Sequence, residues 1–197
     1  MKNVKIIIAD IRQSTEDAKQ NLSQIAPYYV EKYMSAKIKK VAGQELVSGY
    51  LLNKYLGIDQ DEQITYNEYK KPSPATGSIF FNLSHSEDYV VLAISDCNVG
   101  VDVEKIGICH EATVKKIFST KQKEELSCLE GDAKNEAFFR MWTACEAMLK
   151  LKGTGFGEEW DKDVPPVENC RIYTERFNDY ILSCATEAEV TITIEKL

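Results

Sequence analysis

The order of expected strands and helices repeats once along the chain, and this repetition constrains the fold more than any single motif. An apolar strand at residues 3–9 is followed by helices and then strands, and a strand at residues 99–104 opens the same order again. The halves meet near residues 95–98 and share no visible sequence similarity. Because helices and strands must bury their apolar faces against one another, we expect an α+β fold in which two subdomains, 1–97 and 98–197, pack side by side.

Hydrophobic periodicity and turn residues place the individual elements. A helix with N-cap residues at 14–17 is expected to end before Pro27, and a longer helix is expected over 28–55 with Gly57 as its stop. The other helices are expected at 111–118, 121–129 and 135–151. The other strands are expected at 64–69, 79–83, 89–94, 171–177, 180–186 and 190–194.

The composition argues against some classes of function. With 197 residues, 44% of them hydrophobic, the chain can bury a core without disulfides, and its formal charge of −7 argues against a nucleic-acid binder. Six cysteines are scattered without a CxxC pair, and the apolar run at residues 4–9 is too short for a signal peptide or a membrane span. We therefore expect a cytoplasmic protein with reduced thiols whose partners include neither nucleic acid nor a membrane.

Two carboxylates alternate along the strand that opens the second half. In Gly100-Val101-Asp102-Val103-Glu104 the valines are expected on one face and both acids on the other. Two acids on one face repel each other unless a cation lies between them, and a hard divalent ion such as Mg²⁺ prefers oxygen ligands of this kind. Asp102 and Glu104 are therefore candidate metal ligands.

The last expected helix carries a third acid. Trp142, Glu146 and Lys150 are four residues apart and share one stripe of that helix. The stripe combines a metal ligand, a fixed positive charge and an aromatic wall, which together suit a phosphoryl or pyrophosphate substrate. Taken alone, it is more often part of a core, because Phe138 and Phe139 would point inward in any amphipathic helix.

Another polar group follows the strand expected at 79–83. Ser84 and His85 come at its end, and Lys71-Pro72 lies in the loop before it. Small hydroxyls, an imidazole and an ammonium around a strand end can form a cradle for an anion. Taken singly, His85 is more often a hydrogen-bonded structural histidine, and Lys71 is more often a solvated loop residue.

Together and in this order, these segments resemble the 4′-phosphopantetheinyl transferases, and within them the monomeric surfactin-synthetase-activating type. The matching segments are Lys71-Pro72, Phe81-Asn82-Leu83-Ser84-His85-Ser86, Gly100-Val101-Asp102-Val103-Glu104-Lys105, Phe118-Ser119, Phe138 to Trp142, Glu146-Ala147, and Lys150 to Phe156. The resemblance is weaker before Gly43, and after Trp160 only the strand pattern matches.

The resemblance implies a pseudo-twofold pair of α+β subdomains with coenzyme A bound in the cleft between them. It implies an enzyme that transfers the phosphopantetheine arm of coenzyme A to a serine hydroxyl of an apo acyl, peptidyl or polyketide carrier protein. The other product would be adenosine 3′,5′-bisphosphate.

Roles for individual residues follow from the same resemblance. Asp102, Glu104 and Glu146 would hold Mg²⁺ against the pyrophosphate, and Glu146 would also help to remove the serine proton. Lys150 would neutralise charge that builds up on the phosphates. The candidates for contacts with the coenzyme A phosphates are Lys71, Ser84 and His85, and more weakly Lys32 and Lys40.

The chain departs from the family pattern at two positions. Cys145 stands where the family usually has a lysine before the helix glutamate, and Gln122 stands where it commonly has a glutamate. Cys145 could be small core filling, or its presence could remove a charge-assisted contact from the site.

Two alternatives remain beside the transferase. A degenerate homologue would bind coenzyme A or a carrier protein without transfer, and a metal-dependent hydrolase would release adenosine bisphosphate without any carrier. The candidate docking surface for an acidic carrier is the stretch 114–129, where Lys115, Lys116, Lys121 and Lys123 lie beside Ile117 and Phe118. An ordinary solvated pair of helices would explain this stretch as well.

Overall fold

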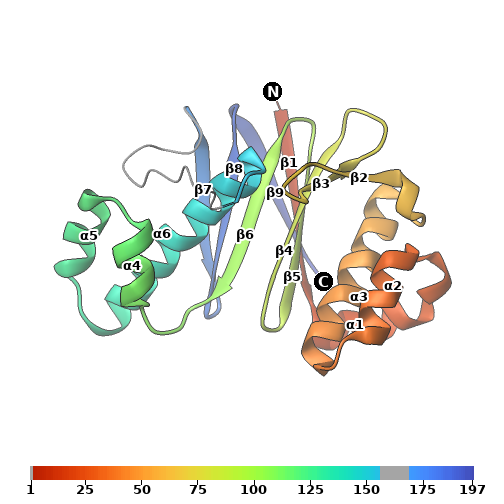
Figure 1. The fold of residues 1–197 in the computed structure, drawn as a ribbon, viewed down its shortest axis with the longest axis horizontal. Helices are drawn as coiled ribbons and strands as arrows, with labels where there is room; N and C mark the ends of the chain where they lie inside the picture. The colour runs from red at the N-terminus through yellow and green to blue at the C-terminus, as the bar shows by residue number, and fades with distance from the viewer. Residues whose placement is uncertain (1, 156–168) are drawn as a thin grey trace.

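The fold is described by a computed structural model that covers residues 2–155 and 169–197 (Figure 1). The elements of the first half are β1 (Lys2–Asp10), α1 (Ile11–Gln20), η1 (Leu22–Gln24), α2 (Pro27–Ser35), α3 (Lys39–Leu56), η2 (Asp61–Gln63), β2 (Ile64–Tyr66), β3 (Pro72–Pro74), β4 (Phe80–Ser86) and β5 (Tyr89–Ser95). Those of the second half are β6 (Val99–Lys105), α4 (Glu111–Ile117), α5 (Thr120–Ser127), α6 (Gly131–Lys152), β7 (Arg171–Phe177), β8 (Tyr180–Thr186) and β9 (Val190–Lys196).

Two larger sheets lie side by side in the middle of the molecule. One has the strand order β4-β5-β1-β9 and the other the order β6-β8-β7. In each, a hairpin pairs antiparallel with the strand that opens its half: β4–β5 with β1, and β7–β8 with β6. The halves thus repeat one topology, and the expected α+β fold is confirmed.

The last strand crosses between the halves. β9 belongs to the second half of the sequence, but it pairs in parallel with β1, with Lys2 opposite Val190 and Ile8 opposite Lys196. The first sheet therefore contains a strand from beyond residue 97. The division of the chain at that residue stays a prediction.

Helices cover the outer face of each sheet (Figure 1). α1, α2 and α3 lie on the first sheet, and α6 lies on the second with α4 and α5 beside it. β1 is buried on both faces, since Val4, Ile6 and Ile8 pack between the sheets while Ile7 and Ala9 pack under the helices. This double burial explains why residues 3–9 form an almost continuous apolar run.

Several boundaries differ from the sequence-based expectation; for example, β2 ends at Tyr66 and α6 begins at Gly131. The first helix begins at Ile11, because the side chain of Asp10 accepts the Arg12 N–H and caps it. The helix expected over 28–55 is two helices, which part at residues 36–38 and pack against each other. β4 continues to Ser86, so the polar segment after residue 83 is part of a strand and not a loop. The predicted stop at Gly57 is confirmed, with φ of 65°.

Gly100 allows β6 and α6 to approach closely. A Cβ atom at this position would lie 2.1 Å from the carbonyl oxygen of Ala147 and 2.4 Å from the backbone nitrogen of Leu151. Only a glycine therefore permits this distance between strand and helix. The contact sets the position of α6 beside the two acids of β6.

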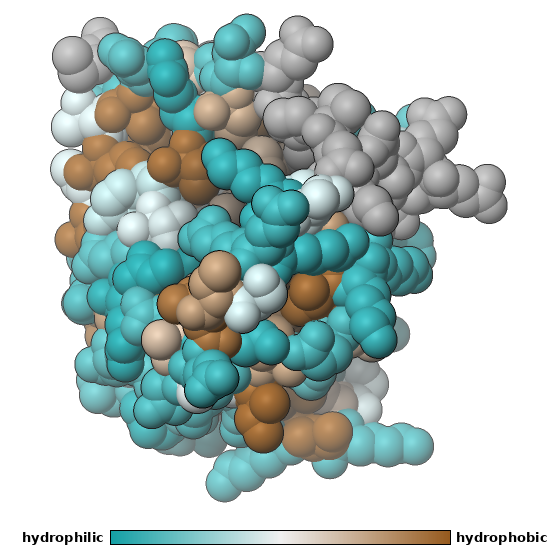
Figure 2. Space-filling view, turned by 90° about the vertical axis from the view of Figure 1, so that its left-hand side faces the viewer, coloured by the Kyte–Doolittle hydropathy of each residue, from teal (hydrophilic) through white to brown (hydrophobic). Residues whose placement is uncertain are grey.

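The surface over α4–α6 is mostly hydrophilic and is interrupted by small hydrophobic areas (Figure 2). Within the residues that the structure describes, no helix has both the length and the apolar character that a membrane crossing requires.

Candidate functional site

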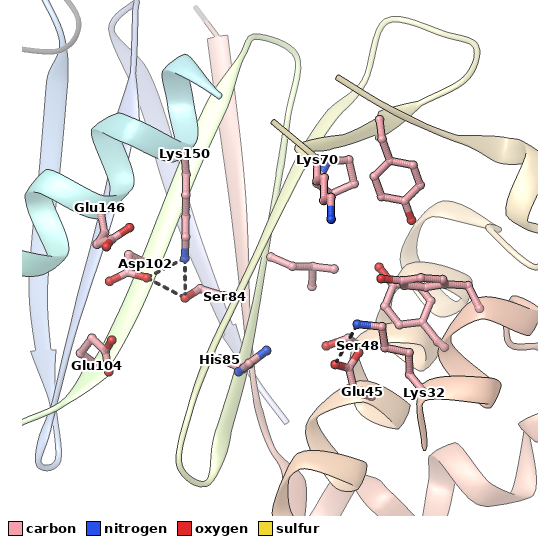
Figure 3. A pocket seen from close by; sticks show the side chains of 15 residues that line it. Lys32, Glu45, Ser48, Lys70, Ser84, His85, Asp102, Glu104, Glu146 and Lys150 are labelled. Carbon is pink, nitrogen blue, oxygen red and sulfur yellow. Dashed lines mark hydrogen bonds and ion pairs between the residues drawn. The ribbon is translucent and has the colours of Figure 1, made fainter. Parts of the chain in front are cut away.

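A cleft of about 430 Å³ lies between the two halves of the molecule (Figure 3). One wall comes from α2, α3 and β4, and the other comes from β6 and α6. Seven of the residues predicted from the sequence line this cleft: Lys32, Ser84, His85, Asp102, Glu104, Glu146 and Lys150.

Asp102, Lys150 and Ser84 form a closed group of hydrogen bonds. Lys150 Nζ lies 2.6 Å from Asp102 Oδ1 and 2.9 Å from Ser84 Oγ, and Ser84 donates to the same Asp102 oxygen at 2.8 Å. Asp102 is only 4% exposed. Its second oxygen, Oδ2, is buried and has no hydrogen-bond partner among the described residues. Leaving a buried acceptor unpaired costs on the order of 1–3 kcal/mol, so the arrangement favours a further electropositive partner at Oδ2.

Glu104 and Glu146 face the same space as Asp102 (Figure 3). Burial, together with the negative charges nearby, raises the pKa of Glu146 to about 7. The pKa of Glu104 is also raised, mainly by burial and in part by Asp102, although a hydrogen bond from Ser86 opposes this change. Three carboxylates that line one cleft are a donor set suited to a hard cation. Even so, within the described ranges no group of three or more His, Cys, Asp or Glu residues is arranged to hold a metal ion.

His85 lies at the edge of the cleft on β4, with its side chain exposed. The walls of the cleft still desolvate the imidazole in part, and this lowers its pKa below the ordinary value. His85 is therefore a neutral hydrogen-bonding group near neutral pH, available to a ligand in the cleft.

Lys71 is not brought into the cleft. Its Nζ donates to Asn98 Oδ1 at 2.8 Å and to the carbonyl oxygen of Leu151 at 3.0 Å, at the end of α6. Partial burial lowers the pKa of this ammonium group to about 8. The neighbouring Lys70, which has a left-handed backbone with φ of 64°, lines the cleft instead. Lys71 thus connects the loop before β3 to the start of β6 and the end of α6.

The two weaker lysine candidates have different positions. Lys32 lines the cleft, lies 3.8 Å from a carboxylate oxygen of Glu45 and sits over the ring of Tyr28. Lys40 lies outside the cleft and forms ion pairs with Glu87 and Asp88. The structure therefore places Lys32 but not Lys40 where a ligand in the cleft could reach it.

Residues 98–195 match the family model of the 4′-phosphopantetheinyl transferase superfamily. This region contains Asp102, Glu104, Glu146 and Lys150. The chain belongs to this superfamily. The resemblance seen in the sequence is thereby confirmed.

Several proteins named as 4′-phosphopantetheinyl transferases are similar to the chain. Sfp of Bacillus subtilis strain 168 is 28% identical over 155 residues, which cover 76% of this chain and 69% of Sfp. The protein gsp of Aneurinibacillus migulanus is 31% identical over 137 residues, covering 68% of this chain and 57% of gsp. The protein psf-1 of Bacillus pumilus is 35% identical over 97 residues, covering 48% of this chain and 42% of psf-1. The chain therefore spans less than two thirds of gsp and of psf-1.

Cys145 and Gln122, the two residues that depart from the family pattern, both have structural contacts. Cys145 is 5% exposed and packs in a core with Phe138, Leu149 and Ile181, on the side of α6 that faces away from the cleft. Gln122 and Ser119 cap α5 through reciprocal side-chain and backbone hydrogen bonds. Phe156 and Trp160, which mark the end of the resemblance, lie outside the described residues.

The expected docking surface over 114–129 is only partly available to a partner. Ile117 and Phe118 are buried under α6, 7% and 1% exposed, so they cannot supply its apolar component. Lys115 and Lys116 are exposed on α4. The exposed apolar side chain nearest along the chain is Ile108, which is 79% exposed in the loop between β6 and α4.

Part of the cleft wall was not predicted from the sequence. Glu45 and Ser48 of α3 line it, together with Lys70 and aromatic residues of α2 and β2. Glu45 and Ser48 are three residues apart and share one helix face, but that signal is common to most helices. The exposed aromatic Tyr66 gave no signal, since single exposed apolar residues are normal.

Proposed function

We propose that this chain transfers the 4′-phosphopantetheine group of coenzyme A to a serine hydroxyl of an apo acyl, peptidyl or polyketide carrier protein. The observation that carries the proposal is the meeting of Asp102, Glu104, Glu146 and Lys150 in one cleft that also contains His85 and Lys32. Carboxylates that could bind a cation and lysines that could bind phosphates line the same cleft, and this combination fits a pyrophosphate substrate.

Two grooves that meet at Glu104 support coenzyme A as that substrate. Beside the cleft, a second groove of about 410 Å³ shares Glu104 and is lined by Trp142, Phe138 and Phe139 among others. Coenzyme A carries a phosphorylated nucleoside on one side of its pyrophosphate and the pantetheine arm on the other. The nucleoside phosphate would lie toward Lys32 and Lys70, and the arm would lie along the aromatic groove.

The reaction is an in-line displacement at the β-phosphorus. The serine oxygen forms a bond to this phosphorus, and the bond from phosphorus to the bridging oxygen breaks, so that adenosine 3′,5′-bisphosphate leaves. Glu146 accepts the serine proton, directly or through water. Lys150 lies beside Asp102 and neutralises negative charge on the phosphates as the bridging bond breaks.

The three carboxylates have the chemistry that a divalent cation prefers, and such a cation would supply charge neutralisation at the pyrophosphate. Asp102, Glu104 and Glu146 would hold it, and this assignment is supported by the buried Oδ2 of Asp102, which has no hydrogen-bond partner in the part of the chain that the structure describes. Mg²⁺ is the expected ion, because carboxylates together with substrate phosphates are its usual ligands.

The test is intact-mass spectrometry of an apo carrier protein incubated with this chain, coenzyme A and Mg²⁺. The carrier should gain one phosphopantetheine group, and the gain should be lost with a chelator or with Glu146→Ala. Glu16→Ala is the matched control, because Glu16 is an exposed acid of α1 outside the cleft.

Other outcomes would identify the alternatives. Coenzyme A binding in calorimetry without modification of several apo carriers would favour a degenerate binding protein. Release of adenosine bisphosphate from coenzyme A in the absence of a carrier would favour a phosphoanhydride hydrolase.

The docking surface is tested separately. If an acidic carrier docks on α4, then Lys115→Glu together with Lys116→Glu should raise the KM for the carrier and leave the KM for coenzyme A unchanged. An unchanged KM for the carrier would remove α4 from the docking surface.

A further inference from the structure

β4 and β6 lie next to each other although they belong to different sheets. The link between them consists of side chains at alternate positions of β4 that accept backbone N–H groups of β6. The contacts are Asn82 Oδ1 with the N–H of Val101 (2.8 Å), Ser84 Oγ with that of Val103 (3.2 Å) and Ser86 Oγ with that of Lys105 (3.2 Å).

This side-chain ladder occupies the edge of β6 that faces β4, where β6 forms no backbone pairing with another described strand. Among the described strands, the backbone partner of β6 is β8, along its other edge. Without these side-chain acceptors, the buried edge of β6 would leave backbone N–H groups unpaired, and each unpaired group would destabilise the fold. Because the acceptors and the N–H groups both repeat every second residue, the ladder also sets the register between the two sheets.

The same serine hydroxyls reach the two acids of β6. Ser84 Oγ donates to Asp102 Oδ1 at 2.8 Å, and Ser86 Oγ donates to Glu104 Oε2 at 2.8 Å. Each serine therefore accepts from the backbone of β6 and donates to a carboxylate on that strand. The position of each carboxylate is tied to the ladder and not only to its own rotamer.

The hydrogen-bonding capacity of Ser84 is fully used. A hydroxyl group has one hydrogen to donate and two lone pairs that accept. Ser84 donates to Asp102 and accepts from the N–H of Val103 and from Lys150 Nζ. No capacity is left for a direct bond to a substrate phosphate in this arrangement.

We propose that Ser84 and Ser86 are positioning residues that orient Asp102 and Glu104 toward a divalent cation. Ser84 then acts on the substrate only through Asp102 and Lys150, and not as the phosphate contact that the sequence led us to expect. The inference rests on the proposed function for the identity of the metal ligands, but it is testable without coenzyme A or a carrier protein.

The decisive variants are at Ser86, which is only partly buried and so tolerates substitution better than Ser84. Ser86→Ala removes the donor to Glu104, and Ser86→Thr keeps a hydroxyl group. The matched control is Ser95→Ala, because Ser95 is a buried serine of β5 that bonds backbone groups of Asn3 and Cys97 and touches no acid of the cleft. Mn²⁺ serves as the probe, with its affinity measured by electron paramagnetic resonance.

We expect Ser86→Ala to bind Mn²⁺ about tenfold more weakly, a loss typical when a group that orients a metal ligand is removed. Ser86→Thr and Ser95→Ala should bind Mn²⁺ as the unmodified chain does. Amide hydrogen exchange should show faster exchange of the Lys105 N–H in Ser86→Ala alone, with β8 unchanged, which shows that the variant is folded.

Two results would overturn the proposal. Mn²⁺ affinity that is unchanged in Ser86→Ala, with weaker binding of coenzyme A in the absence of metal, would make Ser86 a direct ligand contact. No Mn²⁺ binding by the unmodified chain would remove the metal site and the positioning role with it. Failure of transfer with intact Mn²⁺ binding would instead count against the proposed function alone.

Discussion

Without a bound cation, the carboxyl group of Glu146 should destabilise the folded chain as the pH rises. Burial and the nearby Asp102 carboxylate raise the pKa of Glu146 from 4.5 to about 7 in the folded state. Between these two values the folded chain keeps a proton that the unfolded chain has lost. The free energy of unfolding therefore falls as the pH rises through this range, and Glu146→Gln should not show this part of the fall.

The size of the effect follows from the shift. A pKa that rises from 4.5 to about 7 corresponds to about 3 kcal/mol, at about 1.4 kcal/mol for each pKa unit. Glu146 is only half-buried, and solvent screening reduces the expected difference to about 1–2 kcal/mol.

The assay is urea unfolding of the metal-free chain at pH 5 and pH 8, followed by tryptophan fluorescence. Glu146→Gln should match the unmodified chain at pH 5 and exceed its stability at pH 8, and added Mg²⁺ should reduce the advantage at pH 8. Glu16→Gln controls for the loss of one negative charge at an exposed position. The same stability difference between Glu146→Gln and the unmodified chain at both pH values would refute the reasoning.

Three further predictions concern packing and the lysine pair. Gly100→Ala should lower the free energy of unfolding in urea by about 1–3 kcal/mol or more, because the new Cβ meets the backbone of α6; an unchanged midpoint would mean that α6 moves freely. Lys71→Met should lower the thermal midpoint, because it loses the hydrogen bonds at the end of α6, and should leave the KM for coenzyme A unchanged. Lys70→Met should raise the KM for coenzyme A and leave the thermal midpoint unchanged. A raised KM in Lys71→Met with a lowered midpoint in Lys70→Met would exchange the roles of the two lysines. Cys145→Ala should cost about 1 kcal/mol in urea unfolding and leave the transfer rate unchanged, since Cys145 faces the core; a slower transfer would connect this position to the cleft.

The sequence was sufficient for features that depend on local periodicity. Asp102 and Glu104 alternate with buried valines, and the structure places both acids in the cleft as expected. Glu146 and Lys150 are one helical turn apart, and they lie together in the cleft for the same reason.

Features that depend on which distant segment a residue packs against could not be predicted from local periodicity. Lys70 and Lys71 are adjacent in the sequence, but Lys70 lines the cleft and Lys71 donates to the end of α6. The break between α2 and α3 carries neither glycine nor proline, so periodicity alone extended one helix across it. The hydrogen bonds between Ser84 and β6 could not be predicted from the sequence, because the residues that they join are far apart along the chain.

The pairing of β9 with β1 has a consequence for the order of folding. β1 is the first described strand and β9 the last, so β9 must be synthesised and leave the ribosome before β1 can pair with strands on both of its edges. Contacts so distant in the sequence carry a large loop-closure entropy and slow folding. During synthesis the apolar β1 has an unprotected edge, a state in which nascent chains recruit chaperones or aggregate.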